Sequence, residues 1–165
     1  LVYTFQLEGT KVDGVDNNIK LKGAEFKLQN ADGLYYKKDA DGNVSWVAED
    51  VADVVTSAEN TGLFGFTGLD VGTYTLVEVT PPAGYNTIPP TTVEIEATYQ
   101  NDKLDTLTPN GDILIGKASI NVENNKGTTL PETGGMGTTL FYVIGAVLVL
   151  GAGVVLVSKK RMAEK

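Results

Sequence analysis

Three polar residues lie in line with the apolar faces of three expected β-strands. Alternate residues of a β-strand lie on the same face. A buried charge without a partner is costly, so such groups are normally paired or neutral. If the three polar positions are buried, the core contains a lysine, a glutamate and an asparagine, and these groups need partners. They are Lys11 after Tyr3-Phe5-Leu7-Gly9, Glu78 after Tyr74-Leu76, and Asn124 after Ala118-Ile120-Val122.

Two other arrangements fit the same alternation. Each of the three residues could lie at the end of its strand and reach solvent with its polar tip. Gly9 could also form a β-bulge, which would turn Lys11 outward. The alternation alone leaves these arrangements open.

The elements that must position these residues are short strands. β-type runs separated by turn residues predict an all-β sandwich or barrel. Asp39-Ala40-Asp41-Gly42 is a hairpin signal between two of the runs, and residues 50–57 are a candidate helical turn. The expected strands are Tyr3–Leu7, Glu25–Gln29, Leu34–Lys38, Val44–Val47, Leu63–Thr67, Tyr74–Val79, Thr91–Tyr99 and Ala118–Glu123.

The composition limits the chemistry that the chain can perform. It contains no Cys and no His, which excludes Cys/His nucleophilic catalysis and His- or Cys-based zinc sites. We expect no metal and no cofactor. The net charge of −8 argues against nucleic acid as a partner. Neither a signal peptide nor an initiator Met is visible at Leu1, so we expect the C-terminal piece of a longer secreted precursor.

The C-terminus carries a pentapeptide, an apolar run and a basic tail, in that order. Leu130-Pro131-Glu132-Thr133-Gly134 precedes the uncharged run 138–157, whose length of about 20 residues suffices for a membrane-spanning helix. Lys159-Lys160-Arg161 follow, so the positive-inside tendency places the tail 158–165 in the cytoplasm and residues 1–137 outside.

This order resembles the cell-wall sorting signal of Gram-positive surface proteins. The resemblance implies that a sortase recognises Leu130, Pro131, Glu132, Thr133 and Gly134. The sortase would cut after Thr133 and transfer its carbonyl to an amine of a peptidoglycan precursor or to a Lys of a neighbouring pilin subunit. Contact with the membrane through 138–157 would then be transient, and the mature chain would be covalently attached to the cell wall.

Residues 1–126 resemble a CnaB-type (SpaA-like) domain. The resemblance implies an Ig-like or prealbumin-like β-sandwich with an internal Lys–Asn isopeptide bond, formed with the help of a buried Glu. On this chain the linked pair would be Lys11 and Asn124, and the catalyst Glu78. Lys20 or Lys22 in place of Lys11, and Asn125 in place of Asn124, stay open. The matching stretches are Lys11-Val12-Asp13, Leu21-Lys22-Gly23-Ala24-Glu25-Phe26, Gly68 to Glu78, Pro82-Ala83-Gly84-Tyr85, and Val122-Glu123-Asn124.

Burial would drive the chemistry of such a bond. Desolvation favours the neutral forms of a lysine and a glutamate, so a proton can pass from Lys11 to Glu78. The neutral amine is then the nucleophile. Protonated Glu78 would hydrogen-bond the Asn124 carboxamide and stabilise charge on its oxygen. Ammonia leaves and the reaction occurs once, so we expect no enzyme with turnover.

Together these resemblances predict the C-terminal domain of a sortase-assembled pilin subunit at the cell surface. Residues 127–137 would link the domain to the spanning segment and carry the sorting motif. An alternative is the stalk of a wall-anchored adhesin with an upstream binding module. A third is the anchor domain of a secreted enzyme, although no nucleophile–base pair or Gly-rich phosphate loop supports turnover.

Overall fold

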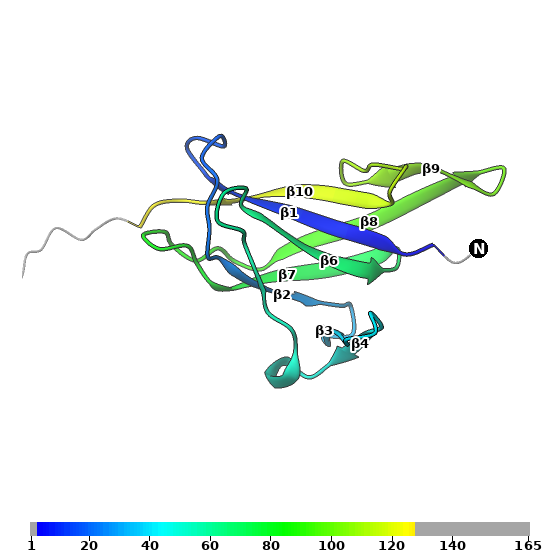
Figure 1. Ribbon diagram of the computed structural model, residues 1–165, viewed down its shortest axis with the longest axis horizontal. Coiled ribbons are helices and arrows are strands. Elements are labelled where there is room, and N and C mark those ends of the chain that lie inside the picture. The colour runs from blue at the N-terminus through cyan, green and yellow to red at the C-terminus, as the bar shows by residue number, and fades with distance from the viewer. Residues whose placement is uncertain (1–2, 128–165) are drawn as a thin grey trace, which may run out of the picture. The chain divides into compact units, whose positions relative to one another are not determined.

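The computed structural model describes residues 3–127, which fold as an all-β domain (Figure 1). The predicted sorting motif, spanning segment and basic tail lie outside the described residues. Among residues 3–127, no helix is long and apolar enough to cross a membrane. The elements of this part are β1 (Phe5–Asp13), β2 (Glu25–Gln29), β3 (Tyr35–Lys38), β4 (Val44–Val47), η1 (Glu49–Val51), β5 (Val55–Thr56), β6 (Leu63–Leu69), β7 (Gly72–Thr80), β8 (Thr91–Gln100), β9 (Lys103–Thr108) and β10 (Lys117–Asn124).

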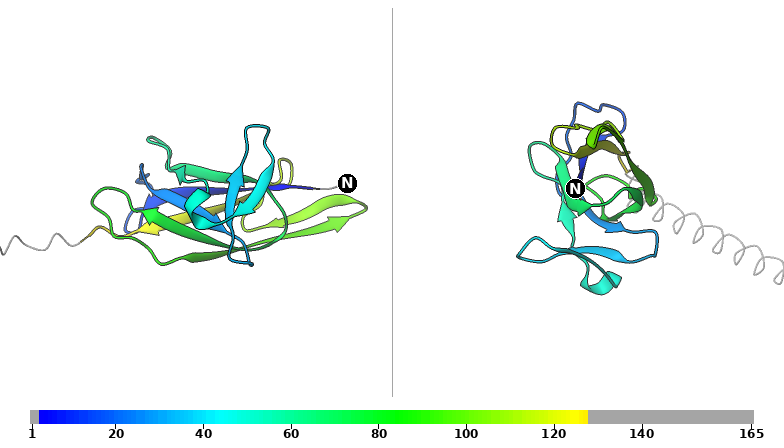
Figure 2. Two further views of the ribbon diagram at one scale, coloured as in Figure 1. Left: turned by 90° about the horizontal axis from the view of Figure 1, so that it is seen from below. Right: turned by 90° about the vertical axis from the view of Figure 1, so that its right-hand side faces the viewer.

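The strands form two sheets. One holds three strands in the order β10-β1-β6, with β1 parallel to β10 and antiparallel to β6. The other is antiparallel in the order β4-β3-β2-β7-β8-β9, with β5 added beside β2. The β3–β4 hairpin projects to one side of the domain (Figure 2). The predicted all-β sandwich is therefore confirmed.

The core between the sheets is built from alternate residues of the strands. Phe26 of β2 and Phe64 of β6 stack with ring centroids 4.0 Å apart and so join the two sheets. A Cβ atom at Gly9 of β1 would lie 2.1 Å from the Phe64 ring. Gly9 is thus a packing requirement, since any larger residue would displace the ring that joins the layers.

The bulge considered at Gly9 does not form. Gly9 stays in register with Ile120 of β10. The register of β1 against β6 shifts earlier, between Phe5 and Leu7. The inward alternation therefore continues past Gly9, and the side chain of Lys11 is fully buried.

Most predicted strands are present with small changes in their bounds. The candidate helical turn over 50–57 is wrong, because only η1 is helical there and Val55 pairs with Phe26 of β2. β9 has no counterpart among the predicted strands. It buries only Leu107, so the apolar alternation that marks the other strands is weak.

The topology brings the first and last strands together. In the parallel pair, Lys11 lies opposite Val122 and Asp13 lies opposite Asn124. Glu78 lies on β7 in the other sheet and faces this pair across the core. The fold thus positions three residues that are far apart in sequence at one end of the sandwich.

Candidate functional site

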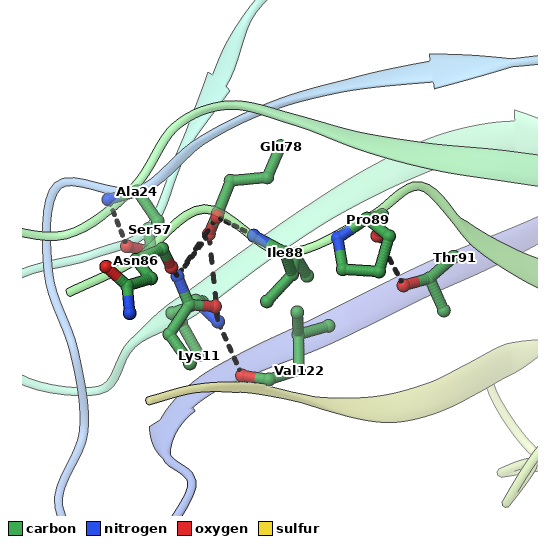
Figure 3. Close-up of polar contacts among 10 residues, drawn as sticks. Lys11, Ala24, Ser57, Glu78, Asn86, Ile88, Pro89, Thr91 and Val122 are labelled. Atoms are coloured by element: carbon green, nitrogen blue, oxygen red, sulfur yellow. Dashed lines mark hydrogen bonds and ion pairs between the residues drawn. The ribbon is translucent and has the colours of Figure 1, made fainter. Parts of the chain in front are cut away.

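Lys11, Glu78 and Asn124 meet in the core, which is one of the arrangements that the alternation allowed. Their exposed fractions are 0%, 5% and 0%. The interpretation of three strand-end residues that reach solvent is therefore wrong. Figure 3 shows Lys11 and Glu78 pointing toward each other, beside Ile88 and Val122.

Lys11 is held by three oxygen-bearing groups. Its Nζ donates to the Val122 carbonyl oxygen at 2.9 Å and to Oδ1 of Asn124. Oε1 of Glu78 lies 3.8 Å from the same nitrogen. Burial lowers the pKa of Lys11 from 10.5 to about 8, while the Glu78 carboxylate offsets part of that shift. A neutral amine is therefore far more accessible here than at the protein surface.

Asn124 is oriented by its neighbours. Its Nδ2 donates to both carboxylate oxygens of Glu78 at 3.0 Å and to the Asn86 carbonyl oxygen at 2.8 Å. Its Oδ1 accepts from Lys11. The reverse orientation would point the amide NH2 at the lysine and the oxygen at another carbonyl, so this one satisfies every partner.

The position of Glu78 differs from the expected one in a single respect. The carboxylate faces the amide nitrogen of Asn124 rather than the oxygen that it was expected to polarise. Its Oε2 also accepts a hydrogen bond from the backbone N–H of Ile88 at 3.0 Å. Glu78 is therefore placed to exchange protons with the nitrogen that would leave as ammonia.

The alternative residues lie elsewhere. Lys20 is exposed and donates to the Asn17 carbonyl oxygen. Lys22 pairs at the surface with Glu59. Asn125 is exposed as well. Lys11 and Asn124 are the lysine and asparagine that the fold brings together.

Other groups of the site carry no signal in the sequence, or a signal that is easily overlooked. The Asn86 carbonyl and the Ile88 N–H are backbone groups, so the residue types at these positions do not predict their role. Asp13 is different, because the alternation that leads to Lys11 continues by one step to Asp13, which is also buried. Among the described residues, no three His, Cys, Asp or Glu side chains form a potential metal site.

Two family profiles match the chain. A prealbumin-like fold domain, SpaA, matches residues 5–111, which is more than half of the chain. The chain belongs to this family. The LPXTG cell wall anchor motif matches residues 122–164, which include Leu130–Gly134. This SpaA-type protein is therefore attached to the Gram-positive cell wall, at the cell surface, as the sorting signal predicted.

Solved structures of pilus proteins share the SpaA-type fold. The group B streptococcus pilus 2b backbone protein is 33% identical, with a TM-score of 0.62, over 78% of this chain and 43% of that one. The C-terminal domain of the shaft pilin SpaA from Lactobacillus rhamnosus GG is 26% identical, with a TM-score of 0.56, over 76% of this chain and 100% of that one. The chain thus spans less than half of the streptococcal protein. No curated protein sequence matches it.

The buried lysine should make the stability of an uncoupled SpaA-type domain depend on pH. Asn124→Leu removes the carboxamide and keeps the Lys11 amine. Below the folded pKa of about 8, the folded state carries the full free-energy cost of burying the charged amine. Above the unfolded value of 10.5 the amine is neutral in both states, and this cost vanishes. The free energy of unfolding should therefore rise between these pH values, by about 3 kcal/mol.

Urea unfolding at several pH values measures this rise. The matched control is Asn124→Leu combined with Lys11→Met, which has no buried amine and should lack the rise. Equal pH profiles for the two variants would show that Lys11 is not desolvated as described.

Proposed function

We propose that this chain is the C-terminal domain of a sortase-assembled, wall-anchored pilin subunit, stabilised by an isopeptide bond between Lys11 and Asn124. The observation that carries the bond is the buried cluster of an amine, a carboxamide and a carboxylate. The anchor motif and the likeness to pilus backbone and shaft proteins support the assembly. The bond is a maturation step and the chain turns over no substrate.

The contacts support a specific order of proton transfers. Lys11 gives a proton to Glu78, and the neutral Nζ attacks Cγ of Asn124. As the Nζ–Cγ bond forms, Glu78 passes its proton to Nδ2, which lies 3.0 Å away, and then takes a further proton from Nζ and passes it on in the same way. The Cγ–Nδ2 bond then breaks. Glu78 ends as a carboxylate, and the two protons released by Nζ leave with Nδ2 as ammonium.

The Val122 carbonyl has a supporting role in this scheme. It accepts a hydrogen bond from Nζ and so fixes the amine beside the carboxamide. Holding the two reacting groups together in this way replaces an encounter by an intramolecular step. The contacts of Asn124 with Asn86 and Glu78 fix the other reactant.

The bond would carry tension along the fibre. It joins residues that are 113 positions apart, one on each of two parallel neighbouring strands. Force entering through Phe5 would cross from Lys11 to Asn124 and leave toward the anchor, without unfolding what lies between. By analogy with a disulfide, closing so long a loop stabilises by about 4–5 kcal/mol.

The mass of the purified protein tests the bond. Loss of ammonia lowers the mass by about 17 Da relative to the sequence, because the amide nitrogen departs. Glu78→Gln keeps the size of the side chain but cannot carry the proton, so it should retain the full mass and melt at a lower temperature. The control Glu123→Gln removes an exposed carboxylate of β10 and should still lose ammonia. A Glu78→Gln protein with a mass about 17 Da below that of its own sequence would exclude the role given to Glu78.

Wall-released protein from a Gram-positive host with a pilin sortase tests the assembly. We expect a ladder of covalent multimers that withstands hot detergent, with each mature chain ending at Thr133. Residues 134–165 should be absent, because the transferred carbonyl belongs to Thr133. Removing Leu130–Gly134 should abolish the ladder. A single discrete wall-linked band would instead identify the stalk of an adhesin.

A further inference from the structure

Two contacts of the site come from a segment outside every strand. Residues 81–90 connect β7 to β8. The Asn86 carbonyl oxygen of this segment accepts from Nδ2 of Asn124, and the Ile88 N–H donates to Glu78. Both the leaving nitrogen and the carboxylate therefore depend on where this segment lies.

Backbone hydrogen bonds fix the segment to the residues that directly follow the last strand. The Asn86 N–H donates to the Asn125 carbonyl oxygen at 3.0 Å, and the Gly127 N–H donates to the Gly84 carbonyl oxygen at 2.9 Å. Tyr85 lies between them and forms an isolated antiparallel bridge with Lys126. The segment and the residues just after β10 thus form a short ladder next to Asn124.

One side chain joins the segment to the first strand. The Tyr85 hydroxyl donates to Oδ2 of Asp13 at 2.8 Å. Within residues 3–127 it is the side-chain hydrogen bond that connects 81–90 with β1. Asp13 lies two residues after Lys11 on the same face and opposite Asn124 in the parallel pair. This contact therefore spans from the segment to the strand that carries the amine.

Hydrogen bonds to both oxygens hold the Asp13 carboxylate in place. Its Oδ1 accepts from the backbone N–H groups of Val15 at 2.8 Å and Asp16 at 3.0 Å. Its Oδ2 also lies 3.8 Å from Nζ of Lys126. The Asp16 N–H, the Tyr85 hydroxyl and the Val15 N–H together hold the pKa of Asp13 below its ordinary value. The carboxylate is thus an ionised and rigid acceptor for the tyrosine.

We infer that Tyr85 and Asp13 are a positioning pair that sets the rate of isopeptide formation at Lys11, Glu78 and Asn124. This inference rests on the proposed bond. Neither residue exchanges a proton with the reacting groups. Their hydrogen bond holds the segment against β1, so that the Asn86 carbonyl and the Ile88 N–H keep Nδ2 and the Glu78 carboxylate aligned. A misplacement of about 1 Å in such a geometry can cost about a hundredfold in rate.

The rate of ammonia loss measures this role directly. The full chain is synthesised in a cell-free system with detergent, samples are quenched over time, and intact mass gives the cross-linked fraction. Tyr85→Phe should react at least about tenfold more slowly than the wild type, because the segment loses its link to β1. Tyr36→Phe is the matched control, since it removes a hydroxyl that donates at 2.9 Å to the Thr67 carbonyl oxygen on other elements. It should react at the wild-type rate.

Two further measurements separate positioning from a general effect on folding. Fluorescence of Trp46, the single tryptophan, reports folding of each variant and should be unchanged by Tyr85→Phe. Asp13→Asn keeps the Oδ1 acceptor of the turn but replaces the oxygen that accepts from Tyr85. It should slow the reaction, and its combination with Tyr85→Phe should be no slower than the slower single variant, because both substitutions alter the same contact.

The outcomes distinguish this inference from the proposed function. A wild-type chain that keeps its full sequence mass would remove the bond itself, and the inference with it. Normal ammonia loss in the wild type and an equal rate in Tyr85→Phe would overturn the positioning role alone. Equal slowing in Tyr36→Phe, or slowing matched by slower folding, would overturn it too. Selective slowing with normal folding supports it.

Discussion

The desolvation of one amine is the constraint on which this structure depends. A lysine with no exposed surface costs free energy as long as its charge is uncompensated. Three groups around Lys11 offset this cost: the Val122 carbonyl, the Asn124 carboxamide and the Glu78 carboxylate. The same burial that is unfavourable for the charged amine lowers its pKa to about 8 and so makes the neutral nucleophile accessible. Conversion to an amide would remove the buried charge permanently.

The arrangement of the strands brings these groups together. Parallel pairing of β1 and β10 puts Lys11 and Asn124 near one end of the domain, although almost the whole domain lies between them in sequence. The other sheet supplies Glu78, and the segment between β7 and β8 supplies backbone groups that align it. The chain enters and leaves at opposite ends of the domain (Figure 1). A cross-link at this place therefore lies on the path that tension would take.

The sequence predicts those parts that have a regular pattern. Alternation places Lys11, Glu78 and Asn124 on possible core faces, but the family resemblance is needed to favour their burial over strand ends that reach solvent. Followed one step further, the same alternation would have reached Asp13. It cannot find the Asn86 carbonyl or the Ile88 N–H, because any residue type carries these groups. It also cannot say that Glu78 faces the nitrogen of Asn124, since the direction of a side chain depends on contacts across the core. β9 escapes prediction because it buries only Leu107.

The most direct test of the central claim is to map the covalent link in the mature protein. Tryptic peptides of the purified wild type are sequenced by tandem mass spectrometry. We expect one branched species in which the peptide that contains Lys11 is joined to the one that contains Asn124, with a mass about 17 Da below their sum. Trypsin should fail to cut after Lys11, because its amine is an amide. Two separate unmodified peptides, or a link through Lys20, Lys22 or Asn125, would contradict the account.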